Sequence, residues 1–156
     1  MPVEPVSIPR ETSAILSFKI QPFEGSLSVT PVVDEIPLPE LVAAFERERQ
    51  FEPAGGYGGL VPEWFNYGDL DRYFLGDFEE GSYFARLKRV YLLGCYCGEV
   101  GCWPLLARIT AGAQSVVWDY FDQAHRRNRD YSAFGPFVFD EEQYRQAVAA
   151  LTSKKG

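Results

Sequence analysis

The sequence predicts an α+β fold, in which a single antiparallel sheet of roughly five strands carries two main helices packed on one face. Two observations indicate it. Residues 14–33 and 86–121 contain short segments of alternating or continuous apolar residues, separated by glycine-rich turns, as in antiparallel strands joined by hairpins. Residues 38–50 and 140–151 instead repeat apolar residues every three or four positions, which is the spacing of helices.

The first expected element is a hairpin. Residues 14–20 and 26–33 alternate between apolar and polar side chains, and the segment 21–25 contains the proline and glycine that break the pattern. Because Pro31 has no N–H to donate to a neighbouring strand, we expect the second strand to lie at an edge or to contain a bulge.

The first helix is predicted over residues 38–50. Its apolar stripe follows the i, i+3, i+4, i+7 spacing and consists of Leu38, Leu41, Val42 and Phe45. Pro39 suits the first turn, where its missing N–H costs little. The residues 46–49 are expected on the solvent side of this helix.

The glycine-rich segment 54–62 does not have the spacing of a phosphate-binding loop. No Lys-Ser or Lys-Thr pair follows its glycines, and no helix opens on a G-x-G-x-x-G pattern. We interpret these glycines as positions that need a positive φ or the close approach of a neighbouring chain segment.

Three antiparallel strands are predicted next, over residues 86–97, 102–109 and 115–121, with turns at Gly98–Gly101 and Ala111–Ala113. The last element is a helix that begins after Asp140. Asp140 and Gln143 have the spacing of a capping box, and Phe139 with Tyr144 fits a hydrophobic staple.

Length and charge narrow the classes of function. The 156 residues match the size of one domain, so residues 1–156 are predicted to form a single domain with residues 1–12 as a loosely held N-terminal arm. Acidic residues outnumber basic ones by 22 to 15, which gives a formal charge of −7. This charge disfavours nucleic acid and anionic membranes as partners and suits a basic protein.

Three cysteines within eight residues form the sharpest local pattern. Cys95, Cys97 and Cys102 with His125, the single histidine, could supply four zinc ligands. The C-x-C-x4-C spacing departs from the usual C-x2-C knuckle, and a disulfide across the turn or packed free thiols are the alternatives. We expect free thiols with no cofactor. The odd number of cysteines, without a signal peptide pattern, favours a reducing cytoplasm.

An enzymatic site is a further alternative. Asp119, Asp122, His125 and Arg126 lie close in sequence and include groups that can perform acid–base chemistry. The competing interpretation is structural, with the carboxylates paired to the arginines at positions 108, 126 or 127. No nucleophile motif of the G-x-S-x-G type accompanies them.

Several segments together resemble a family of small uncharacterised bacterial proteins. They are the run GCxCGxxGCWP at 94–104, the strand residues Val117, Trp118 and Phe121, the pair His125-Arg126, the run YSxFGPF at 131–137, and the block GYGGLVP at 56–62. The resemblance covers about half of the chain. It implies a bacterial, cytosolic single domain, and it carries no catalytic residue because the family has no assigned activity.

The leading functional hypothesis is a non-enzymatic, small cytosolic interaction protein that neutralises a basic protein partner, as immunity proteins do. The net charge and the aromatic and acidic stretch 63–84 favour it. A zinc-stabilised domain and an enzyme of unrecognised type are the two alternatives.

Overall fold

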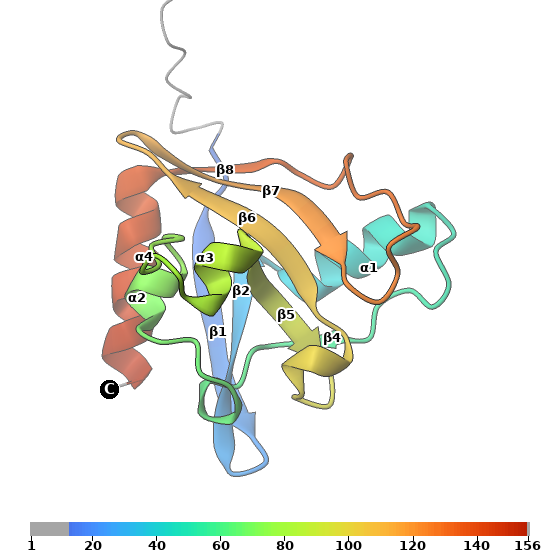
Figure 1. Cartoon of the computed structure of the whole chain (residues 1–156), viewed down its shortest axis with the longest axis horizontal. Helices are drawn as coiled ribbons and strands as arrows, with labels where there is room; N and C mark the ends of the chain where they lie inside the picture. The colour runs from blue at the N-terminus through green and yellow to red at the C-terminus, as the bar shows by residue number, and fades with distance from the viewer. Residues whose placement is uncertain (1–12, 156) are drawn as a thin grey trace, which may run out of the picture.

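A computed structural model describes residues 13–155 (Figure 1). The fold is α+β, and the described residues form two antiparallel sheets with two long and two short helices. The first sheet has the order β1-β2-β3 and consists of β1 (Leu16–Phe23), β2 (Ser26–Val33) and β3 (Ile36–Pro37). The second has the order β4-β5-β6-β7-β8 and consists of β4 (Tyr57–Gly58), β5 (Val90–Cys95), β6 (Leu105–Ala111), β7 (Ser115–Gln123) and β8 (Phe137–Asp140).

The helices are α1 (Leu38–Glu48), α2 (Leu70–Tyr73), α3 (Tyr83–Leu87) and α4 (Glu141–Lys155), and two short 3-10 turns are η2 (Pro62–Trp64) and η3 (Val100–Cys102). The predicted N-terminal arm, residues 1–12, lies outside the described residues. None of the helices in the described part of the chain is long and apolar enough to cross a membrane.

The expectation of a single sheet is wrong, because the N-terminal hairpin and the central strands belong to separate sheets. The glycine-rich segment joins them. Tyr57 and Gly58 pair with the end of β5, and two residues later Leu60 exchanges two backbone hydrogen bonds of 2.7 and 2.8 Å with Val29 of β2. One short segment therefore serves both sheets, and the five-stranded sheet curls around the shared core (Figure 1).

Close approach explains two of the glycines at this junction. A Cβ on Gly59 would lie 2.4 Å from the Thr30 hydroxyl and 2.8 Å from the Val29 carbonyl. A Cβ on Gly58 would lie 2.9 Å from the Cys95 carbonyl oxygen. The junction is therefore narrow enough to exclude any side chain, as the sequence interpretation of this segment expected.

The hairpin is confirmed, but the position of its second strand is not. β2 is the middle strand of its sheet, with Pro31 facing Phe18 of β1. β3 pairs with β2 at Val32 and Val33, immediately after the proline, so the missing N–H falls where β3 makes no pair. A proline is thereby accommodated in a central strand.

The three central strands are confirmed as β5, β6 and β7, with one change at the start. Residues 83–87 form the short helix α3, whose cap is the Ser82 hydroxyl, which accepts the Ala85 N–H at 3.4 Å. The first strand therefore begins at Val90. A bulge in the β6–β7 pairing lies opposite Ala107 and includes Tyr120, which has a positive φ of 50°.

The two long helices pack differently, because α1 contacts the first sheet whereas α4 contacts both sheets. α1 contacts β2 and β3, whereas α4 contacts β1, β7 and β8 (Figure 1). The predicted α4 cap is confirmed, because the Asp140 carboxylate accepts the Gln143 N–H at 3.1 Å. The Gln143 side chain bonds both the N–H and the carbonyl of Leu16, so it ties the helix to β1.

Candidate functional site

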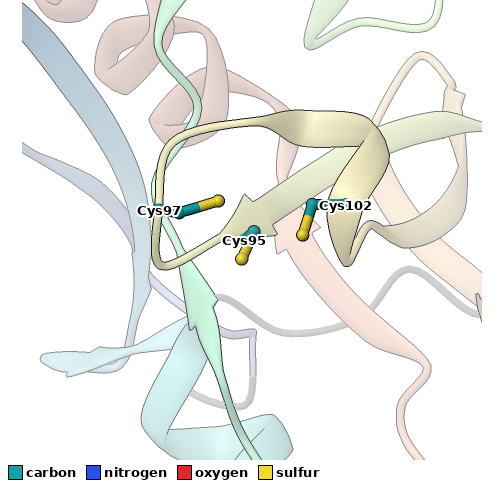
Figure 2. A group of neighbouring side chains, drawn as sticks. All are labelled: Cys95, Cys97 and Cys102. Atoms are coloured by element: carbon teal, nitrogen blue, oxygen red, sulfur yellow. The ribbon is translucent and has the colours of Figure 1, made fainter.

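The three cysteines come together in the loop between β5 and β6. Cys95 is the last residue of β5, Cys97 lies in the turn that follows, and Cys102 is the last residue of η3 (Figure 2). All three sulfur atoms lie within 4.8 Å of one another. Cys95 is buried and the other two are exposed, so the cluster opens to solvent on one side.

Backbone hydrogen bonds and glycines fold this loop back on β5. The Gly98 N–H donates to the Cys95 carbonyl at 2.8 Å, and the Cys102 N–H donates to the Glu99 carbonyl at 3.1 Å. Gly98 has a φ of 94°, and a Cβ there would lie 2.5 Å from the Trp64 ring. The glycine is therefore required both for the turn and for its packing.

The cysteines differ in acidity. Burial raises the pKa of the Cys95 thiol to about 11, so this thiol keeps its proton at neutral pH. A hydrogen bond with the Cys95 side chain, followed by one with the Glu99 backbone, lowers the pKa of Cys97. One buried protonated thiol thus lies beside one exposed thiol that ionises more readily.

This arrangement can hold a metal ion. Tetrahedral Zn²⁺ with Zn–S bonds of about 2.3 Å places its sulfur ligands about 3.8 Å apart. The observed sulfur atoms would need to move together by about 1 Å at most. Two of the three belong to a turn and a single 3-10 turn, where such a shift requires little rearrangement.

His125 is near the loop but outside the sulfur cluster of the described residues. Its Nε2 lies 2.7 Å from the carbonyl oxygen of Gly101, and its ring stacks on Trp103. The guanidinium of Arg126 covers the same indole at 5.0 Å. The structure therefore brings together three of the four predicted zinc ligands and engages the fourth in another contact.

The four residues of the predicted acid–base site do not come together: the two aspartates line one cavity, and His125 and Arg126 lie beside the cysteine loop. Asp119 receives two hydrogen bonds from Arg108 at 2.9 and 2.8 Å, as the structural interpretation expected. Asp122 pairs with Arg89 at 3.1 Å, an arginine that the sequence had not indicated. Both carboxylates line a cavity of about 470 Å³, whose described lining does not include His125 or Arg126.

A buried polar network lies under α1. Glu46 is fully buried, and one of its oxygen atoms accepts hydrogen bonds from the Tyr57 hydroxyl at 2.7 Å, the Tyr131 hydroxyl at 2.5 Å and Arg129 at 3.2 Å. The other oxygen accepts the Gly55 N–H at 2.8 Å. No buried side-chain nitrogen or oxygen of the described residues lacks a partner.

The network reaches the cysteine loop through Trp103. The Trp103 indole donates to the Gly55 carbonyl at 2.9 Å, and the Arg129 guanidinium lies 5.8 Å from its ring. Burial, and then the hydrogen bond with Glu46, raises the pKa of Tyr131 to about 12, so its hydroxyl remains a donor throughout the neutral range.

The expectation that residues 46–49 all lie on the solvent side is wrong for Glu46, whose carboxylate is the centre of this buried network. The signal was nevertheless present, since Leu38, Val42 and Glu46 are spaced by four and therefore share one face of the helix. A glutamate in an apolar stripe indicates a buried partner of opposite charge. That partner, Arg129, is 83 residues away in the chain.

Comparison of the chain with protein-family models, with curated proteins and with solved structures yields no match. The resemblance to small bacterial proteins therefore stays a prediction.

Proposed function

We propose that the chain binds a thiophilic metal ion, zinc first among them, through Cys95, Cys97 and Cys102. The observation that carries this proposal is the approach of the three sulfur atoms to within 4.8 Å of one another. Thiolates favour Zn²⁺ and Cu⁺ over hard cations, and a reducing cytoplasm, which we propose as the location, would keep the thiols available.

The metal would join the end of β5 to η3. Because Trp103 follows Cys102 directly and covers the buried network, the bound ion would also hold this cover in place. With His125 engaged by Gly101, the protein would supply three ligands, and two of them, Cys97 and Cys102, are exposed to solvent. The proposed site is thus a zinc-stabilised loop with three thiolate ligands, in which water would complete the four-coordinate shell that Zn²⁺ prefers.

Titration of the reduced protein with Co²⁺ and Zn²⁺ tests the proposal. We expect one ion per chain, thiolate-to-cobalt absorption bands that zinc displaces, and a higher melting temperature with metal. Because the Cys95 pKa is about 11, binding must displace its proton, so the affinity should fall by at least about tenfold for each pH unit below neutral.

Matched variants separate the ligands. Cys97→Ser and Cys102→Ser change exposed residues and should abolish the cobalt bands while the protein remains folded. His125→Ala should leave the affinity within about twofold, since the imidazole lies outside the cluster. Cobalt bands that persist in both serine variants, or no binding at micromolar metal, would contradict the proposal.

A second candidate function is recognition of a basic protein, the immunity-like role. The observation that favours it is charge placement, because residues 63–84 contain six acidic residues and one arginine, a balance of −5 within a total of −7. We expect binding to a small basic protein that weakens as salt rises and no binding to an acidic protein of similar size. Equal binding to both would contradict this role.

A further inference from the structure

The acidic stretch 63–84 folds around a pocket. We call it the acidic aromatic pocket. Its volume is about 370 Å³, and its apolar lining consists of the rings of Tyr67, Tyr73, Phe78, Tyr83 and Phe84. This volume lies at the lower end of the range of ligand pockets, about 300–1,000 Å³, and is sufficient for one long side chain.

Mutual packing holds these rings in place. The Phe84 ring lies at the centre, with centroids 5.0 Å from Tyr73, 5.3 Å from Phe78 and 5.1 Å from Tyr83. Phe84 and Tyr73 are buried, whereas Tyr83 is 49% exposed and donates or accepts a hydrogen bond of 2.6 Å with the Tyr91 hydroxyl. The pocket therefore has a rigid base and an aromatic ring on its exposed side.

Carboxylates complete the lining. Asp69 occupies the N-cap position of α2, yet its side chain does not accept a hydrogen bond from that helix. Asp77 and Glu79 both face Arg72, at 3.2 and 3.9 Å, and the Glu79 side chain is 82% exposed. The lining therefore contains three carboxylates and one guanidinium, that of Arg72, and this excess of negative charge leaves a negative field over the aromatic rings.

We propose that the acidic aromatic pocket docks an arginine or lysine side chain from a basic protein segment, an inference that rests on the basic-protein recognition proposed above. Cations bind over the faces of aromatic rings, and carboxylates at the rim pair with the same charge. The existing pairs of Arg72 with Asp77 and Glu79 show that these acids accept a guanidinium. Phosphate groups would be repelled by the same field.

The test is a titration of the isotope-labelled full chain with a short arginine-rich peptide, followed by NMR. The matched probe is the same peptide with every arginine replaced by citrulline, which keeps the shape and removes the charge. We expect the arginine peptide to shift the resonances of residues 67–84 in a salt-dependent manner and the citrulline peptide to bind at least about tenfold more weakly.

Two charge-matched variants locate the site. Asp69→Asn with Glu79→Gln removes two lining carboxylates and should weaken the arginine peptide by about three- to tenfold. Glu35→Gln with Glu48→Gln removes the same charge from exposed positions outside the pocket lining and should change its affinity by less than about twofold. Tyr83→Leu should weaken binding by about two- to fivefold through loss of the ring face.

The following outcomes would contradict the docking of a basic side chain in the acidic aromatic pocket. Shifts confined to residues outside 67–84, or equal losses in the two double variants, would overturn the pocket while leaving recognition of a basic partner in place. Equal binding of the citrulline peptide would contradict both the docking of a cation in the pocket and the recognition of a basic partner, because binding would then not depend on the positive charge of the peptide.

Discussion

Glu46 and Glu48 lie two positions apart on α1 and have opposite environments. Glu46 is fully buried and accepts four hydrogen bonds, whereas Glu48 is exposed. A buried carboxylate is tolerated when its partners compensate for the water that it loses, and Arg129 with two tyrosine hydroxyls does so here. The same residue type is therefore structural at one position and solvent-facing at the other.

We predict that Glu46→Ala lowers the free energy of unfolding by about 3–5 kcal/mol, because it leaves the Arg129 charge buried without its partner. Glu48→Ala on the same helix should change it by less than about 0.5 kcal/mol. Urea unfolding monitored by tryptophan fluorescence measures both. Similar losses in the two variants would show that the buried pair does not contribute as described.

At the scale of elements, α4 has two separate attachments. Asp140 caps its first turn, and the Gln143 side chain bonds the backbone of Leu16 at 3.0 and 2.7 Å. The cap could be predicted from the sequence because Asp140 and Gln143 lie within one helical turn. The second attachment joins positions 127 residues apart, so local spacing contained no information about it.

We predict that Asp140→Ala costs about 0.5–2 kcal/mol, because it removes the acceptor for the Gln143 N–H. Hydrogen exchange of the amides of residues 141–144 should accelerate in this variant. Gln146→Ala, at an exposed position on the same helix, is the control and should leave these rates unchanged. Unchanged exchange in Asp140→Ala would show that the cap is not formed in solution.

At the scale of the whole molecule, the two sheets are linked by the segment 57–60. Tyr57 and Gly58 pair with β5, and Leu60 bonds Val29 of β2. The same segment positions the Tyr57 hydroxyl in the Glu46 network, and Trp103 from the cysteine loop contacts the adjoining Gly55. The sheet junction, the buried network and the proposed metal loop are therefore one connected region.

We predict that Gly59→Ala destabilises the protein by about 1–3 kcal/mol, since its Cβ would lie 2.4 Å from the Thr30 hydroxyl. The amides of Leu60 and Val29 should then exchange faster than those of β6. Gly112→Ala, where a Cβ would meet the Ser115 carbonyl at 3.4 Å, is the matched control with a change below about 1 kcal/mol. Equal effects at the two glycines would contradict a tight junction.

The sequence by itself determined the elements whose signals lie within a few residues: the hairpin, both long helices, the Asp140 cap and the three central strands. It also determined that the three thiols gather, because they lie within eight residues around a glycine turn. Only the tertiary structure decided the division into two sheets, the pairing of Asp122 with Arg89, the exclusion of His125 from the sulfur cluster and the burial of Glu46. These features depend on contacts between residues far apart in the chain, and periodicity and capping patterns describe only neighbours.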